Sequence, residues 1–495
     1  MTSYDLYLLA PEITMAALGV LVIILHMVVG RKGILAAVAV AGLIVPLAFS
    51  VALWGEVNAD ADGQIIGVFN TLAVDKFGLF FKFLVMSILA LVIMSSVDFV
   101  SDIRQLEGEY YGLIIFSAAG IMLLSSTIDL ISIYVALELT TLPLVALAAF
   151  IRDSRSTEAG IKFFVLSAMS SAVLLYGMAL TYGFTGTTHL PGIIERLETY
   201  SNTGVPFGSN ALFLSVVMII AGFGFKIASV PFQMWVPDVY EGSPTPITAF
   251  LSVASKAAGF AVILRVFYLA FGHVSVDWGA MFAVLSAISM TLGNLVAVAQ
   301  SNIKRMLAYS TIAHAGFLMI GVAAVATNVP SGETAMGPSG VLFYLCAYAV
   351  TNLAAFFAII AISRRTGSEM ISSFVGMGRR APVLAIILAF SMVSLLGIPP
   401  TAGFMGKLYI FGAAMKSDLV WLVVVGVVNS AVSAYYYMRV IRVMYTASPE
   451  DGEAISVSHA SRMALYITAI GILALGIFPS PLMNAAEKAV AVLFL

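Results

Sequence analysis

The chain has 495 residues, of which 61% are hydrophobic and only 10% are charged, and its formal net charge is −2. A water-soluble domain carries about 25% charged residues, so this composition predicts a membrane protein with many spans. The slightly acidic balance argues against nucleic acid as a partner, and the single cysteine, Cys346, excludes an internal disulfide or a four-cysteine iron–sulfur site. Because no GxGxxG or Walker-type loop is present, we expect any energy for work to come from a partner or an ion gradient.

Fourteen segments of the chain are apolar enough, and long enough at about 20 residues, to cross a bilayer. We expect these spans at 6–29, 33–53, 72–97, 110–126, 128–150, 158–185, 210–230, 246–270, 277–299, 303–325, 339–363, 381–414, 418–446 and 460–479. The longest connections, at 54–71, 186–209 and 447–459, are interpreted as loops. The fold class is therefore an all-α polytopic membrane protein.

The loop charges predict the orientation of the bundle. Of the 24 Lys and Arg residues, 14 lie in or beside joints that follow odd-numbered spans, Arg31 and Lys32 among them, 3 lie on the other side and 7 lie within spans. Positive charge marks the cytoplasmic side, so both termini are expected on the outer side of the membrane.

Two of the predicted spans contain helix breaks. Pro231 follows closely on the seventh span's lysine, and the pair Pro399 and Pro400 interrupts the twelfth span. Proline removes a helix hydrogen bond, and the freed backbone is tolerated in a membrane only where it meets protein or water. The breaks lie five spans apart, which reverses orientation and predicts two inverted five-helix repeats, at 110–270 and 277–446. Residues 1–109 then form three leading helices, and 447–495 form the fourteenth helix and a tail.

Ionisable residues lie within several spans, and each costs roughly 2.5–3.5 kcal/mol near the bilayer centre on insertion scales. Such residues face a protein interior or a wet cavity and are functional by default. The candidates are Glu138, Lys162, Lys226, Lys256, His314 and Lys407.

We expect these groups to form a proton relay. Pairing of Glu138 with Lys226 beside the first break would alter the proton affinity of the lysine, so this contact is a hypothesis of the sequence. Lys256 would carry the proton laterally through water and serines, and His314 titrates near neutrality if hydrated. Lys407, after the second break, is the expected exit group.

Three other cations are open to a simpler interpretation. Lys162 lies near the predicted cytoplasmic end of its span, where snorkelling of the ammonium to the interface competes with a relay role. Lys82 and Arg265 also lie nearer to span ends, and for them we favour snorkelling or pairing between helices.

Several strings taken together resemble one family: DLISIYVALELTTLPLVALAAF at 129–150, PDVYEGSPTPITAF at 237–250, NIKRMLAYSTIAHAGFLMIG at 302–321 and SLLGIPPTAGFMGKLYIF at 394–411. They are similar to subunit N of bacterial respiratory complex I, the proton-translocating NADH–quinone oxidoreductase. The likeness runs over nearly the whole chain. One departure is Gln233, where many relatives have a histidine; an amide cannot titrate, so a relay at that point needs water.

The resemblance implies an antiporter-like fold and proton transfer driven by quinone reduction in partner subunits. The matching site residues would be Glu138, Lys162, Lys226, Lys256, His314 and Lys407. NADH, FMN, iron–sulfur clusters and quinone would be held by partners, which would include neighbouring antiporter-like and small membrane subunits. The chain itself would have no redox centre and would lie in the bacterial inner membrane.

Three alternatives remain at this point. The first is a subunit of a stand-alone sodium/proton antiporter, which shares the general plan of the family. The second is a passive assembly subunit. The third is a haem-binding cytochrome, for which His26 and His314 would have to serve as axial ligands.

Overall fold

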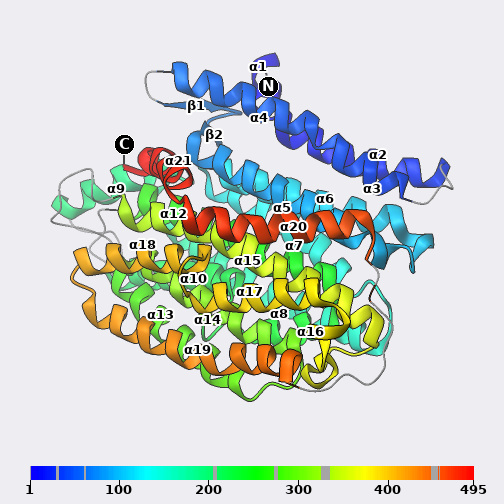
Figure 1. Ribbon diagram of the computed structural model, residues 1–495. Coiled ribbons are helices and arrows are strands. Elements are labelled where there is room, and N and C mark those ends of the chain that lie inside the picture. The colour runs from blue at the N-terminus through cyan, green and yellow to red at the C-terminus, as the bar shows by residue number, and fades with distance from the viewer. Residues whose placement is uncertain are drawn as a thin grey trace.

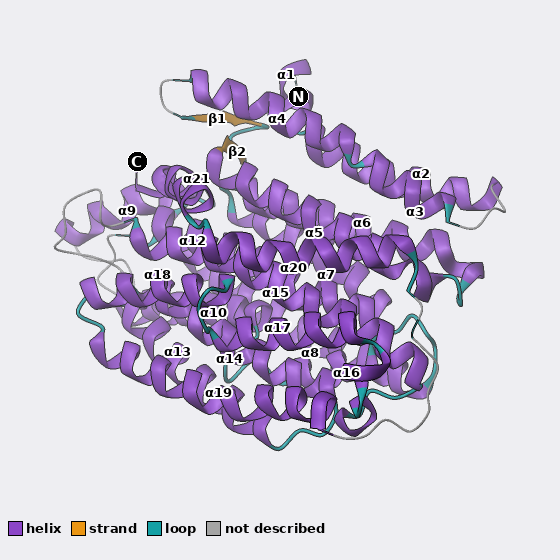
Figure 2. Ribbon diagram, in the orientation of Figure 1, coloured by secondary structure: helices purple, strands orange, loops and turns teal. Residues whose placement is uncertain are grey.

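The computed structural model describes residues 2–28, 33–60, 63–203, 209–272, 277–324, 335–446, 455 and 457–494. Arg31 and Lys32, which contributed to the predicted orientation, lie outside the described residues. The described chain is almost entirely helical, as Figure 2 shows, and the predicted all-α class is confirmed.

The helices follow one another along the chain with short connections. The first third contains α1 (Ser3–Leu8), α2 (Ala10–Val28), α3 (Ile34–Gly42), α4 (Ile44–Ala59), α5 (Lys76–Val100), η1 (Arg104–Leu106), α6 (Glu107–Ser126) and α7 (Leu130–Ala148). The middle contains α8 (Ser154–Thr185), α9 (Leu190–Thr203), α10 (Ser209–Ile227), α11 (Trp235–Gly242), α12 (Thr245–Ala270), α13 (Trp278–Val298) and α14 (Ile303–Ala323). The last part contains α15 (Met336–Thr366), η2 (Ile371–Phe374), α16 (Met377–Arg380), α17 (Pro382–Leu396), α18 (Ala402–Lys416), α19 (Val420–Thr446), α20 (His459–Ile477), α21 (Ser480–Val490) and η3 (Ala491–Phe494).

Within the described residues, 13 helical segments are long and apolar enough to cross a membrane, with α3 and α4 counted as one segment. The twelfth predicted span, 381–414, is divided into two shorter helices, α17 and α18. Each has 15 residues, so the twelfth predicted span is not among the 13 segments. The predicted bounds agree with the helices to within a few residues, apart from the second span, whose helix continues to Ala59.

Three short elements differ from the prediction: strand β1 (Gln64–Gly67) and helix α9 lie in segments interpreted as loops, and strand β2 (Leu72–Asp75) takes up the start of the predicted span 72–97. The two strands form an antiparallel hairpin, whose turn has positive φ at Val68, Phe69 and Asn70. Helix α9 lies in the connection 186–209. The hairpin strands have only four residues each, and α9 carries charged residues on one face, so neither produces the long apolar run by which spans are recognised.

The helices form layers around the three most buried helices, α12, α14 and α15. In Figure 1 the blue helices α2 to α4 form an outer layer beside α5 and α6, and α20 crosses over α15. The most apolar window of α12 is 100% buried, so this helix is surrounded by protein on every side. A helix with no exposed face can carry polar groups only where other helices satisfy them.

Of two buried ion pairs, one joins two N-terminal helices to each other and the other joins the N-terminal part to the rest of the bundle. Lys82 in α5 contacts the Glu12 carboxylate of α2 at 2.7 Å. Arg265 in α12 donates two hydrogen bonds, of 2.8 and 2.9 Å, to the carboxylate of Asp75 just before α5. The expectation of pairing between helices is therefore confirmed for both cations, and snorkelling is excluded. The two acids were not singled out from the sequence because they lie at the ends of helices.

We predict that Asp75→Asn destabilises the protein by about 3–5 kcal/mol, because it leaves the Arg265 guanidinium, only 1% exposed, without a counter-charge. Asparagine keeps the helix-capping oxygen that accepts from the Gly78 amide, so the change removes mainly the charge. The thermal unfolding of the subunit in detergent would measure the effect. The control is Asp102→Asn, whose partner Arg364 is exposed, and which should cost no more than about 1 kcal/mol. Equal unfolding temperatures for the two variants would contradict the prediction.

Candidate functional site

Four of the predicted site residues are almost completely buried inside the helical bundle. Lys226 is 6% exposed, Lys256 2%, His314 3% and Lys407 5%. They come from α10, α12, α14 and α18, which are separated in the sequence and meet in the interior. Buried ammonium and imidazole groups need polar partners, so their hydrogen bonds define what the site can do.

The first break leaves carbonyl groups at the end of α10 that no helical amide can reach. Lys256 Nζ donates to the carbonyl oxygen of Ile227 at 2.9 Å, and Ser255 Oγ donates to that of Lys226 at 3.3 Å. The last carbonyls of a helix carry partial negative charge, so an ammonium is stabilised there. Pro231 lies in the turn before α11, as the sequence predicted for the break.

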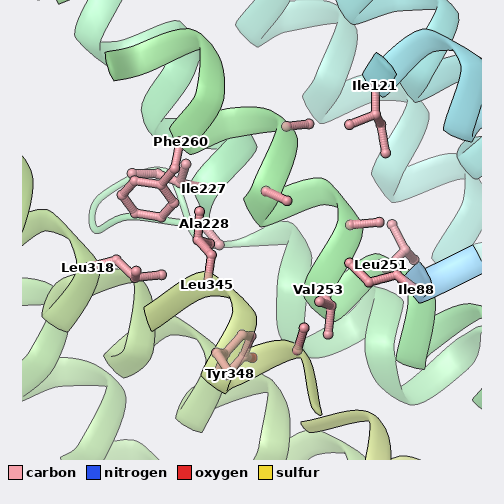
Figure 3. Close-up of a cluster of buried hydrophobic side chains, with 14 of the residues drawn as sticks. Ile88, Ile121, Ile227, Ala228, Leu251, Val253, Phe260, Leu318, Leu345 and Tyr348 are labelled. Carbon is pink, nitrogen blue, oxygen red and sulfur yellow. The ribbon is translucent and has the colours of Figure 1, made fainter. Parts of the chain in front are cut away.

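Apolar side chains enclose this break. Figure 3 shows Ile227 and Ala228 beside Phe260 of α12 and Leu345 of α15. These residues are at most 2% exposed. The ammonium of Lys256 therefore lies in a region of low polarity, where its interaction with the Ile227 carbonyl is stronger than it would be in water.

The second break holds a lysine in the same manner. Lys407 Nζ donates to the carbonyl oxygens of Leu395 and Leu396, at 3.3 and 2.9 Å, and to Ser430 Oγ at 3.0 Å. The ammonium also lies 4.4 Å above the centre of the Phe317 ring. Both breaks thus present the carbonyl end of a half-helix to a lysine.

The turn at the second break depends on close packing of the backbone. Gly397 has φ +89° and ends α17, and Pro399 and Pro400 follow in the turn before α18. A Cβ atom added to Gly403 would lie only 1.9 Å from the Ser394 carbonyl oxygen. Only glycine lets the two half-helices approach this closely.

Glu138 and Lys226 do not form the direct ion pair that the sequence suggested. Lys226 Nζ donates to Thr141 Oγ1, and the Glu138 carboxylate accepts from Ser171 Oγ. The Thr141 hydroxyl itself donates to the Leu137 carbonyl at 2.6 Å, which leaves its lone pairs to accept from the lysine. Sequence analysis missed both hydroxyl partners, because Thr and Ser are common in membrane helices and neither lies in a recognisable motif.

His314 lies between two tyrosines. Its Nδ1 is 2.7 Å from the Tyr344 hydroxyl, and its Nε2 is 3.3 Å from the Tyr437 hydroxyl. The sequence identified the histidine but not the tyrosines: Tyr344 lies on the next helix, α15, and Tyr437 on the distant α19.

Lys162 lies outside this buried group. It is 41% exposed and pairs with Glu158 and Asp238, both at 2.7 Å. Arg305 contacts the same Asp238 carboxylate at 2.9 Å. Partial burial raises the pKa of Asp238, but the hydrogen bonds and charges of Lys162 and Arg305 outweigh this, and the net pKa is below the ordinary value. The structure gives Lys162 no contact with the other five predicted site residues.

Gln233 follows the first break and is partly buried. Its Oε1 has no hydrogen-bond partner among the described residues. An amide oxygen enclosed by protein and without a partner is a site at which a water molecule fits.

Comparisons with known proteins agree with this architecture. The family model for NADH:quinone oxidoreductase/Mrp antiporter transmembrane proteins matches residues 127–433. Subunit N of the NADH-quinone oxidoreductase of Moorella thermoacetica is 40% identical over 496 residues, 99% of both chains. The corresponding protein of Dehalococcoides mccartyi is 45% identical over 84% of this chain and 86% of the relative. The chain belongs to the NADH-quinone oxidoreductase subunit N family.

A solved structure supports the membership in the subunit N family. A chain of respiratory complex I from Thermus thermophilus with bound aureothin is 32% identical, with a TM-score of 0.78 over 96% of this chain and 98% of that chain. The resemblance stated from the sequence motifs is therefore confirmed, as is the antiporter-like fold.

We predict that Gly403→Ala disrupts the second break, because the new methyl group cannot fit against the Ser394 carbonyl. We expect a clear loss of thermal stability, of about 1–3 kcal/mol or more, as for overpacked sites. Gly412→Ala, in the same helix, is the matched control, since a Cβ there meets nothing within 4 Å and should be neutral or slightly stabilising. Thermal unfolding of both variants would measure this, and similar melting of the two would contradict the close packing described here.

Proposed function

We propose that this chain is the proton-translocating membrane subunit of an NADH–quinone oxidoreductase. The observation that carries the proposal is the buried series of lysines and a histidine held by broken helices, in a chain 40% identical to subunit N over its whole length. Ionisable groups inside a membrane protein cost free energy. We infer that these groups are kept because they bind and release protons away from bulk water.

The first half of the relay begins at Glu138 and Lys226. Thr141 Oγ1 is the direct partner of the Lys226 ammonium, and Glu138 lies three residues before Thr141 in α7, so the two side chains are neighbours on that helix. A carboxylate that approaches stabilises the charge on the lysine, and a carboxylate that is neutralised or moves away weakens it. In the proposed step an N–H bond of Lys226 breaks, and the proton moves through water toward Lys256.

The second half continues from Lys256 to the outer side. Lys256 donates a hydrogen bond to the Ile227 carbonyl, and Lys407 donates to the carbonyls of Leu395 and Leu396. In the proposed mechanism these hydrogen bonds break and re-form as the charge on neighbouring groups changes. His314 lies between these helices and accepts and releases a proton on its ring nitrogens. Lys407 releases the proton to the outer side. Moving each charge against 100 mV costs about 2.3 kcal/mol, which quinone reduction elsewhere in the complex would supply.

We assign Lys162 a supporting place in this scheme. It belongs to the charged cluster with Glu158, Asp238 and Arg305, at the end of the bundle that loop charge assigns to the cytoplasm. This cluster would supply protons to the buried groups by way of water. The two repeats, 110–270 and 277–446, would each contribute one broken helix with its lysine.

The remaining parts of the reaction would lie in partner subunits. NADH, FMN, iron–sulfur clusters and quinone would be bound there, and this chain would act as a translocase without a redox centre of its own. It would lie in the bacterial inner membrane beside other antiporter-like and small membrane subunits, with both termini outside.

The alternatives are less well supported. A sodium/proton antiporter shares the family model, but the extensively matching relatives are named as subunits of quinone oxidoreductases. A haem cytochrome would need free histidine nitrogens, whereas both ring nitrogens of His314 are engaged by tyrosines.

We predict that Glu138→Gln and Lys226→Met each lower NADH-driven proton translocation by about tenfold or more, because each removes a charge that the relay requires. The test uses the assembled complex in proteoliposomes, with quinone reduction and dye-reported acidification measured together. Lys488→Met, an exposed cation of α21, is the control and should translocate protons normally.

Normal translocation by both site variants in a fully assembled complex would contradict the relay and favour a passive assembly role. Sodium-dependent translocation that persists without NADH would instead favour the antiporter.

A further inference from the structure

A continuous series of buried hydroxyl groups passes through His314. The Tyr344 hydroxyl contacts Nδ1 at 2.7 Å, and the Tyr437 hydroxyl contacts Nε2 at 3.3 Å. On its other side the Tyr437 hydroxyl lies 2.5 Å from Ser310 Oγ. All four side chains are at most 3% exposed. The series Tyr344–His314–Tyr437–Ser310 joins α15, α14 and α19 in the interior of the second repeat.

The chemistry of imidazole makes this series directional. A neutral imidazole has one N–H donor and one acceptor nitrogen, so one tyrosine must donate to the ring and the other must accept from it. The two tautomers of His314 correspond to the two opposite orders of donors and acceptors. Moving one proton along the whole series converts one order into the other, which is how a hydrogen-bonded chain passes a proton.

One end of the series lies beside the segment of α18 that carries Lys407, and the other lies nearer to the N-terminal end of α14. The Tyr344 ring packs directly on Gly406, where an added Cβ atom would come within 2.3 Å of the ring, and Gly406 precedes Lys407. At the other end, Ser310 lies about 10 Å along α14 from Ile303, and His314 about 16 Å, at 1.5 Å per residue. Ser310 is therefore closer than His314 to the helix end that carries Lys304 and Arg305.

We propose that the hydroxyl groups of Tyr344 and Tyr437 carry protons to and from His314 and are relay members in their own right. This inference rests on the proposed proton translocation and adds two residues to it. In one turnover the Tyr437 hydroxyl takes a proton from Ser310 and gives its own to Nε2. Nδ1 gives its proton to the Tyr344 oxygen, and Tyr344 releases its hydroxyl proton on the Lys407 side. Water on the Ser310 side must supply the proton that replaces the one Ser310 gives away, so each hydroxyl oxygen gains one proton and loses one. Nε2 gains a proton and Nδ1 loses one, so the imidazole stays neutral and changes tautomer. Return of the ring to its first tautomer resets the series.

The test compares phenylalanine variants at matched positions. Tyr344→Phe and Tyr437→Phe keep the buried rings but remove the hydroxyls that contact His314. Tyr348→Phe is the control: Tyr348 lies one turn from Tyr344 in α15, is equally buried, and its ring centre is 5.1 Å from that of His314. Its hydroxyl, however, contacts Thr311 at 2.9 Å and not the histidine.

In the assembled complex, we expect Tyr344→Phe and Tyr437→Phe to lower NADH-driven proton translocation by about tenfold, with subunit content and unfolding temperature close to those of Tyr348→Phe. Incorporation of 3-fluorotyrosine at position 344 or 437 restores a hydroxyl and should restore translocation, which a purely structural ring would not require. Ser310→Ala combined with Tyr437→Phe should be no worse than Tyr437→Phe alone, since the two act in one series.

Translocation by Tyr344→Phe and Tyr437→Phe equal to that of Tyr348→Phe would overturn the inference. So would a loss that 3-fluorotyrosine does not repair. If Glu138→Gln and Lys226→Met still abolish translocation in the same preparations, only the tyrosine inference has failed. If those variants also translocate normally, the proposed function itself has failed.

Discussion

The structure depends on the contact between a lysine ammonium and the open carbonyl end of a broken helix. A membrane interior offers no water to satisfy these carbonyls, and it offers no counter-charge to an isolated ammonium. The hydrogen bonds from Lys256 to the Ile227 carbonyl and from Lys407 to the Leu396 carbonyl satisfy the free carbonyl and stabilise the ammonium together. Each unfavourable group makes the other tolerable, so a break without its lysine, or a lysine without its break, would be costly.

This arrangement explains why the bundle is built around helices that protein encloses wholly or largely, α12, α14 and α15. α12 positions Lys256 at the first break. α15 positions Tyr344 beside His314 and packs on α18 next to Lys407. Neither task is possible for a helix that faces lipid. The start of α5 is joined to α12 by the ion pair of Asp75 with Arg265, so a second kind of buried charge fixes α12 near its C-terminal end.

The contacts of the site are individually weak enough to exchange. The three buried lysines, Lys226, Lys256 and Lys407, donate to carbonyl and hydroxyl oxygens instead of forming close ion pairs, and Glu138 accepts from a serine. A close buried ion pair is difficult to separate, as breaking one costs about 3–5 kcal/mol, whereas a hydrogen bond to a charged group contributes about 1.5–3 kcal/mol. The pairs of Lys82 with Glu12 and of Arg265 with Asp75 are close buried ion pairs, which suits a permanent structural contact between helices. The buried groups in the proposed relay form hydrogen bonds, which exchange more easily and so suit proton transfer.

The sequence by itself determined the membrane class, the spans, the positions of both breaks and the family, because long apolar runs and prolines act locally and leave a direct trace in the residue order. It also marked Lys226, Lys256, His314 and Lys407, since a charge or an imidazole within an apolar run is conspicuous. Only the tertiary structure decided the partners: Thr141 for Lys226, the Ile227 carbonyl for Lys256, and two tyrosines for His314. Hydroxyls and backbone carbonyls occur throughout every helix, and which of them meets a given side chain depends on how distant helices pack, a property that one sequence does not display.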